Sequence, residues 1–311
     1  MKPTRVVFLL FDGVHLLDLA GPVTVFYESG CCGRPYELHY VSPYPHPAAS
    51  AGIGFTAIAP LNSVTITSED IVVVAGMDLS RFRRADDVLW VPWLRTAAAA
   101  GAVICSVCTA AFALAVAGLL QGHNCTTHWA YTRTLQQQFP ELTVLENKLF
   151  VKSGRIYTSA GIATGIDLAL FLVEEQHGAE FAYRVAKDMV VYIRRNGTES
   201  QHSVFLQNRQ HVSYVIHQVQ DYIACHLHQK ITIDVLAVLV YVSPRSVTRL
   251  FKKATGSSIG QYIQQLRVEK AQQLLKANHK MESVARECGF KGPGQLLQLL
   301  KKEQKAASGK Q

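Results

Sequence analysis

The chain of 311 residues is 49% hydrophobic and 17% charged, with a net charge of +8 at pH 7. Its length and apolar content suit a folded protein with two domains and exclude a disordered one. The first apolar run, Val6–Phe11, is too short for a signal sequence or a membrane span. Seven cysteines without a regular spacing do not form a disulfide framework, so a cytoplasmic protein with no membrane partner is expected.

The first two thirds of the chain predict an α/β domain over residues 1–196. Short β-branched runs alternate with helical stretches, which is typical of a flavodoxin-like, doubly wound parallel sheet covered by helices on both faces. Residues 141–161 have the pattern of a hairpin that turns at Ser153 and Gly154. The predicted strands are 5–11, 36–42, 71–76 and 102–107, and the predicted helices are 18–30, 86–101, 109–120, 127–139, 161–178 and 179–195.

Residue Cys108 stands where the predicted strand 102–107 meets an alanine-rich helix. This edge of an open α/β sheet binds ligands, and a tight turn there lifts its side chain above the sheet. The free N–H groups of the following helix are expected to favour the thiolate form of Cys108. Cys105 lies inside the strand and is expected in the core, because a redox pair needs its first cysteine at the helix start.

A metal site is not expected near this turn. His123, Cys125 and His128 are close in sequence but lack the paired spacing of zinc ligands. No metal and no cofactor are therefore predicted.

Three segments resemble the PfpI-type branch of the glutamine amidotransferase-like superfamily, in particular the N-terminal domain of the GlxA-type regulators of the AraC family. They are Val6–Phe26, Val107–Trp129 and Ile156–Gly178. The resemblance implies an acid, an elbow cysteine, a following threonine and a histidine in one pocket, and it assigns Asp18, Cys108, Thr109 and His128 to these roles. Asp18 could instead cap the helix that it begins.

The resemblance has two departures at the elbow. Protease-like and amidotransferase-like relatives carry histidine where this chain has Thr109, and Ala110 stands in place of the usual glycine. Without an adjacent general base, turnover at Cys108 is not expected. A ligand pocket lined by these residues is the favoured interpretation, and a purely structural remnant is the alternative.

A polar segment over residues 197–209 is predicted as a linker, and residues 210–311 as a helical domain. This last part carries 15 Lys and Arg against 6 Asp and Glu, whereas residues 1–209 carry 16 against 17. Such a charge imbalance suits a polyanionic partner and also a solvated basic surface, so motifs must decide between them.

Two helix-turn-helix patterns occupy the basic domain. In the first, Ser243 caps a helix with Pro244 at its first position, and a second Pro-led helix starts at Pro293. Outward arginines and lysines on such helices suit base and phosphate contacts in successive major grooves. The domain resembles the AraC-type DNA-binding domain. The expected DNA-binding residues are Ser243, Arg245, Ser246, Thr248, Arg249, Lys252, Gln295, Gln298, Lys301 and Lys302.

The second pattern departs from the AraC type. Leu296, Gln298 and Leu300 stand where the family carries two phenylalanines and an arginine, and residues 303–311 are expected to lack regular structure. Either Lys301 and Lys302 contribute mainly phosphate contacts, or binding by this unit is impaired.

Together these features predict a transcriptional regulator with no enzyme activity. Its expected partners are promoter DNA, a small effector of the amino acid or amine type, RNA polymerase and a second copy of the chain. Two alternatives remain open from the sequence. One is an isonitrile hydratase-like or glyoxalase-like enzyme that uses Cys108 and carries a degenerate DNA-binding appendage, and the other is a non-catalytic scaffold.

Overall fold

The computed structural model describes residues 3–82, 87–191, 197, 201, 204, 208, 211, 213–276 and 279–308. Contacts divide the chain into two compact units, Met1–Gln201 and His202–Gln311. Of the predicted linker, 197–209, all but residues 197, 201, 204 and 208 lie outside the described residues. None of the described helices is both long enough and apolar enough to cross a bilayer.

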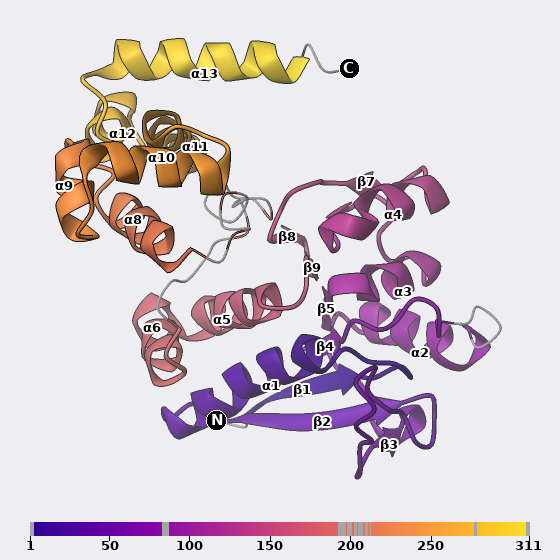
Figure 1. The fold of residues 1–311 in the computed structure, drawn as a ribbon. Coiled ribbons are helices and arrows are strands. Elements are labelled where there is room, and N and C mark those ends of the chain that lie inside the picture. Colours follow the sequence, from indigo (N-terminus) through magenta and orange to yellow (C-terminus); the bar gives the residue numbers. More distant parts are fainter. Residues whose placement is uncertain are drawn as a thin grey trace. The chain divides into compact units, whose positions relative to one another are not determined.

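Within its described residues, the N-terminal unit contains a seven-stranded sheet (Figure 1). Its neighbouring strands pair in parallel, except for the antiparallel hairpin of β8 and β9, so the predicted α/β class is confirmed. In sheet order the strands are β3 (Ala59–Pro60), β2 (Tyr36–Ser42), β1 (Thr4–Leu9), β4 (Ile71–Val74), β5 (Val103–Val107), β9 (Ile156–Ser159) and β8 (Phe150–Ser153).

Helices cover both faces of this sheet because its central strands are apolar on both sides. Alternate residues of β1 divide between two clusters, with Val7 and Leu9 on one face and Val6 and Phe8 on the other. The first face is packed by α2 (Asp87–Ala99), α3 (Ala111–Val116) and α4 (Thr132–Gln138), and the second by α1 (Leu16–Cys31), α5 (Thr164–His177) and α6 (Ala179–Asp188) (Figure 1).

The helix predicted over 109–120 is shorter than expected. A 3-10 turn spans Cys108–Ala110, and α3 ends at Val116 because Gly118 adopts a left-handed φ of 74°. The amide of Gly118 then bonds Ala115 O and that of Leu119 bonds Leu114 O, which satisfies the last carbonyls of the helix. A small parallel pair, β6 (Asn124–Cys125) and β7 (Thr143–Val144), lies beyond the main sheet.

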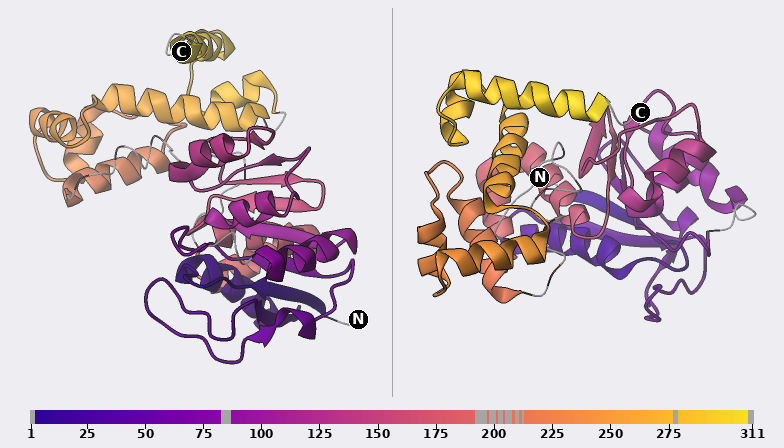
Figure 2. Two further views of the ribbon diagram at one scale, coloured as in Figure 1. Left: turned by 90° about the vertical axis from the view of Figure 1, so that its right-hand side faces the viewer. Right: turned by 45° about the horizontal axis from the view of Figure 1, so that its top comes forward.

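The described part of the C-terminal unit is helical, as Figure 2 shows from two further sides. The final helix reaches Ser308, so the expectation of irregular structure from residue 303 is wrong; residues 309–311 lie outside the described part. The helices are α8 (Tyr214–Cys225), α9 (Ile233–Leu239), α10 (Pro244–Thr255), α11 (Ile259–Lys276), α12 (Met281–Glu287) and α13 (Pro293–Ser308).

Two small hydrophobic clusters hold the described helices of this unit. The first joins α8, α9 and α10 to the start of α11 around Phe251 and Tyr262, whose rings lie 5.3 Å apart. The second joins the later part of α11 to α12 and α13 around Ala271, Val284 and Leu296. The helix α11 therefore belongs to both helix-turn-helix units.

The substitution Trp90→Ala tests the core of the N-terminal unit. Trp90 is fully buried and meets the Phe11 ring at a centroid distance of 5.1 Å. Its loss is expected to lower the free energy of unfolding of this unit by about 3–5 kcal/mol, because it leaves a large cavity. Trp129→Ala, at a tryptophan that is 52% exposed, is the matched control and should cost about 1 kcal/mol or less in chemical denaturation. Equal losses for the two variants would contradict this packing.

Candidate functional site

The chain turns sharply at Cys108, directly after β5. Cys108 is not glycine, yet its φ is +59°, a left-handed conformation that costs about 1–3 kcal/mol. Its carbonyl oxygen accepts a hydrogen bond of 2.8 Å from Thr127 Oγ1. This strained turn places the thiol at the carboxyl end of a central strand.

Two glycines that follow the neighbouring strands lie on either side of Cys108. Gly76 follows β4 and Gly161 follows β9, the strands on either side of β5. A Cβ on Gly161 would lie 2.1 Å from Cys108 Cβ, and one on Gly76 would lie 2.3 Å from an oxygen of Asp18. Backbone therefore packs directly on the cysteine, which is only 2% exposed.

Asp18 lies in the first turn of α1 with no exposed surface. Its Oδ1 accepts a hydrogen bond of 2.5 Å from the Ile162 amide, where the chain again takes a left-handed φ, of +52°. Burial raises the pKa of this carboxyl, while the Ile162 hydrogen bond opposes the shift. Asp18 does not cap α1, because the helix begins after His15 and has no side-chain cap.

His15 is a site residue that sequence reasoning missed. Its Nδ1 lies 3.4 Å from Asp18 Oδ2, and ligand atoms of His15, Asp18 and Cys108 all lie within 4.8 Å of one another. The available signal was its position at the N-cap of α1, three residues before Asp18.

His128 is not part of this group of three among the described residues. Its Nδ1 accepts a hydrogen bond of 3.3 Å from the Ala130 amide and so caps the 3-10 turn Trp129–Tyr131. The His128 ring lies 5.3 Å from the Trp129 ring, centroid to centroid. The residue before it, Thr127, donates a hydrogen bond to the Cys108 carbonyl.

Thr109 braces the elbow from within. Its buried hydroxyl donates to Met77 O at 2.7 Å and accepts from Met77 N at 2.8 Å. Both bonds go to the loop after β4, which also pairs with Val14. Thr109 therefore holds the loop after β4 against the turn at Cys108.

The expectation that the helix after Cys108 favours its thiolate form is wrong. Burial raises the pKa of the Cys108 thiol, and the nearby charge of Asp18 raises it further, while the Thr109 amide opposes the shift. The α-helix starts only at Ala111, and its few residues do not outweigh the loss of hydration. Cys105 is fully buried, as expected.

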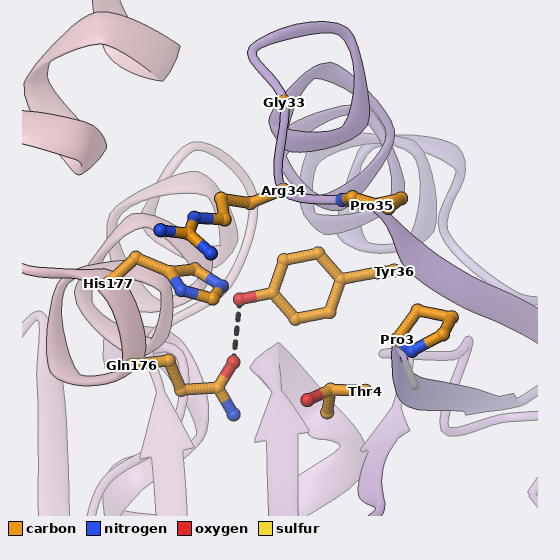
Figure 3. Close-up of a pocket in the computed structure, with 8 residues that line it drawn as sticks. All are labelled: Pro3, Thr4, Gly33, Arg34, Pro35, Tyr36, Gln176 and His177. Carbon is orange, nitrogen blue, oxygen red and sulfur yellow. Dashed lines mark hydrogen bonds between the residues drawn. The ribbon is translucent and has the colours of Figure 1, made fainter. Parts of the chain in front are cut away.

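A hollow of about 540 Å³ lies at the opposite ends of the strands, beside the starts of β1 and β2 (Figure 3). Tyr36 Oη donates to Gln176 Oε1 there at 2.6 Å, and Arg34 and His177 border the space. Burial lowers the pKa of His177, and the Arg34 charge adds to that shift. The hollow is bordered by residues that follow the end of α1 and by the last residues of α5.

In the C-terminal unit, α10 has positively charged side chains on its exposed face and buried apolar side chains on the other. Ser243 Oγ accepts a hydrogen bond of 3.2 Å from the Ser246 amide, and Val247 and Phe251 are buried. The hydroxyls of Ser246 and Thr248 are half-buried and bond within the helix end, to Ser243 Oγ and Pro244 O. The exposed side chains with positive charge are Arg245, Arg249, Lys252 and Lys253.

The helix α13 presents a different surface. Leu296 is fully buried, which anchors the helix on α11 and α12. Gln295 and Gln298 are exposed, although Gln295 Oε1 accepts a hydrogen bond of 2.9 Å from the Lys291 amide. Lys301 and Lys302 are exposed on the same helix.

Comparison with protein families identifies both units. Residues 4–175 match the model of the DJ-1/PfpI family. The chain belongs to the DJ-1/PfpI family. Residues 236–306 match a helix-turn-helix domain, so this member of the family carries an AraC-type domain after its DJ-1/PfpI domain. The organisation implied by the sequence resemblance is confirmed.

Two curated relatives of this DJ-1/PfpI chain bear different names. The HTH-type transcriptional regulator GbdR of Pseudomonas aeruginosa is 30% identical over 294 residues, which cover 93% of this chain and 78% of the relative. An isonitrile hydratase of Pseudomonas putida is 33% identical over 180 residues, which cover 57% of this chain and 74% of the enzyme.

A solved structure also resembles this DJ-1/PfpI chain. The AraC family transcriptional regulator from Pseudomonas putida aligns with a TM-score of 0.54 at 18% identity, over 60% of this chain and all of that one. At this identity the likeness shows the fold alone.

The brace at Thr109 is tested by Thr109→Val, which keeps the side-chain shape and removes the hydroxyl. The buried amide and carbonyl of Met77 then lose their partner, and the free energy of unfolding should fall by about 1–3 kcal/mol. Thr109→Ser should restore most of the loss in denaturant titrations. A Thr109→Val protein as stable as the parent would show that these bonds contribute nothing.

The protonation of Cys108 is tested by alkylation followed by mass spectrometry. Because the thiol is buried and its pKa is raised, Cys108 should react with iodoacetamide far more slowly than the exposed Cys31. Removing the neighbouring charge in Asp18→Asn should lower that pKa and speed the reaction, whereas Asp12→Asn, which faces Arg81, should not. Similar rates at Cys108 and Cys31 in the parent protein would refute this assignment.

Proposed function

We propose that the protein is a DNA-binding transcriptional regulator that responds to a small molecule. In this proposal residues 1–196 form the sensor domain and residues 210–311 form the DNA-binding domain. The observation that carries it is the row of exposed, positively charged side chains on α10. This helix is capped at its start, and its buried apolar side chains pack in one cluster with those of α9.

The helix α10 is proposed to enter the major groove. Its first turn holds Arg245, and Arg249 follows one turn later, so both face away from the buried Val247 and Phe251. An arginine reads guanine through two hydrogen bonds, whereas Lys252 neutralises phosphate. Ser243, Ser246 and Thr248 support this surface chiefly by fixing the start of the helix.

The helix α13 is proposed to position the protein on DNA more than to read it. Lys301 and Lys302 are suited to phosphate contacts, and Gln298 is the exposed amide that offers a base contact. Gln295 already accepts from the Lys291 amide, which leaves its amide nitrogen as a donor.

The effector is proposed to bind near Asp18, Cys108, Thr109 and His128, at the carboxyl edge of the sheet. Buried polar groups gather there beside the strands where the sheet order reverses, the usual ligand position in open α/β sheets. An amino acid or an amine is the effector class that the family resemblance suggests. Its binding would favour one arrangement of the protein and so change promoter affinity.

Binding at this site is proposed without turnover. The Cys108 thiol is protonated and buried, and Thr109 is engaged with Met77, so neither is prepared for nucleophilic attack. These observations favour a regulator over an enzyme of the isonitrile hydratase or glyoxalase type.

We further propose that two copies pair through the sensor domain, since paired copies suit symmetric operators. RNA polymerase is the proposed protein partner at the promoter, and the cytoplasm is the proposed location.

The DNA surface is tested by Arg249→Ala in gel-shift titrations on the intergenic DNA beside the gene. Loss of a base contact should cost about 1–3 kcal/mol of binding free energy. Arg133→Ala, at a highly exposed arginine of the other unit, is the matched control and should leave the affinity unchanged. Parent binding should also weaken steeply when the salt concentration is raised. An unchanged affinity for Arg249→Ala would remove α10 as the reading helix.

A further inference from the structure

The N-terminal unit holds the side chain of its last residue, Gln201, close to the sheet. Its Nε2 donates to two backbone carbonyls, Lys148 O at 2.8 Å and Thr127 O at 3.0 Å. An amide nitrogen carries two N–H groups, so both are used. Four residues earlier, backbone packs on β8, because a Cβ on Gly197 would lie 2.4 Å from Phe150 O. This end of the connecting segment is therefore anchored.

The two carbonyls that Gln201 binds belong to segments that adjoin the elbow. In the first segment, Thr127 also donates its hydroxyl to Cys108 O at 2.8 Å. In the second, the Leu149 carbonyl accepts a hydrogen bond of 2.7 Å from the Ala160 amide. Ala160 directly precedes the glycine that packs on Cys108 after β9. One side chain is thus bonded to both segments that support the turn at Cys108.

The C-terminal unit anchors the other end of the connecting segment on α11. The Val204 amide donates to Glu269 Oε2 at 3.0 Å, and the Val204 side chain packs against the first of the two clusters of this unit. Further along, the Asn208 carbonyl accepts a hydrogen bond of 2.8 Å from Nε2 of the buried Gln220. Only residues 202 and 203 separate this anchor from the one on the N-terminal unit, so the chain between them is short.

We propose that Gln201 is a positioning residue that couples the elbow to α11, so that a change at the elbow alters promoter affinity. In one state its amide N–H groups are bonded to the N-terminal unit, and in the other they are released to water. Gln201 Oε1 is buried without a donor among the described residues, which narrows the free-energy difference between the two states. A molecule that binds one state more tightly shifts the balance between them.

This inference rests on the sensor site of the proposed function and names its connection to the DNA-binding domain. The two can fail separately, because the coupling is first measured on the protein without DNA. If none of the proteins binds DNA, the proposed function fails and the coupling is still decided. If the coupling is absent, the contacts of α10 with DNA still stand.

The first measurement is the rate at which iodoacetamide alkylates Cys108 in the full chain, followed by mass spectrometry. Gln201→Glu keeps the shape of the side chain and removes both N–H donors, so the elbow should open more often. The alkylation rate should then rise by about 5-fold or more, the lower end of common coupling effects. Gln136→Glu is the matched control, because Gln136 Nε2 donates to Leu142 O at 2.9 Å, and it should leave the rate unchanged.

The decisive variant lies in the other unit. Glu269→Ala removes the acceptor of the Val204 amide, and a coupled segment should carry this change to Cys108 and raise its alkylation rate. Adding Glu269→Ala to Gln201→Glu should have no further effect, because the connection is already broken. Glu287→Ala, at a glutamate of α12 that accepts a hydrogen bond from a serine, is the matched control. Circular dichroism verifies that each variant is folded, and Gln201→Ala replaces Gln201→Glu if the latter is not.

The second measurement adds the intergenic DNA beside the gene. Coupling between two sites is reciprocal, so bound DNA should change the alkylation rate of Cys108 in the parent protein. That change should be absent in Gln201→Glu. The promoter affinity of Gln201→Glu should also differ from that of the parent by about 5-fold or more in gel-shift titrations.

Three outcomes would overturn the proposal. The first is a Glu269→Ala protein in which Cys108 is alkylated as slowly as in the parent. The second is a double variant in which the effects of Glu269→Ala and Gln201→Glu add, since the two residues would then act independently. The third is a Gln136→Glu protein whose alkylation rate rises as much as that of Gln201→Glu, which would indicate general destabilisation of the unit.

Discussion

The N-terminal unit depends on how closely backbone approaches Cys108 at the carboxyl edge of the sheet. The strands β4, β5 and β9 are adjacent, so the residues that follow them meet at one place. The left-handed turn at Cys108 fits between positions 76 and 161 because both are glycines, and a side chain at either position would clash with Cys108 or Asp18. The strain of that turn is balanced by the hydrogen bonds of Thr109 to Met77 and of Thr127 to the Cys108 carbonyl.

The same closeness sets the chemistry of the site. Excluding water from the thiol raises its pKa, and the buried charge of Asp18 works in the same direction. A cysteine held in this way is a poor nucleophile. The elbow geometry therefore resembles that of enzymes, whereas the electrostatics disfavour attack by the thiol.

Much of the secondary structure could be predicted from the sequence, because each strand, turn and helix cap depends on residues that are close together in the chain. The β-branched runs, the hairpin at Ser153 and the caps of α10 are encoded by neighbouring residues. The partners of Thr109 and Ile162 are not, since Met77 and Asp18 are 32 and 144 residues away in the chain. His15 was missed for a similar reason, because its role depends on Cys108, which is brought near only by the sheet. The thiolate was expected wrongly, because sequence spacing indicates a helix end but does not measure the burial that opposes it.

The helix α11 has a consequence for operator architecture. It contributes Tyr262 to one small cluster and Ala271 to the other, so both helix-turn-helix units are built on one rod. Each residue of an α-helix adds about 1.5 Å of rise and about 100° of rotation. The number of α11 residues between the two clusters therefore sets the distance and the rotation between the two helix-turn-helix units. Exposed side chains of this helix can change without altering that spacing, but a single insertion or deletion within it would shift the second helix-turn-helix unit relative to the first.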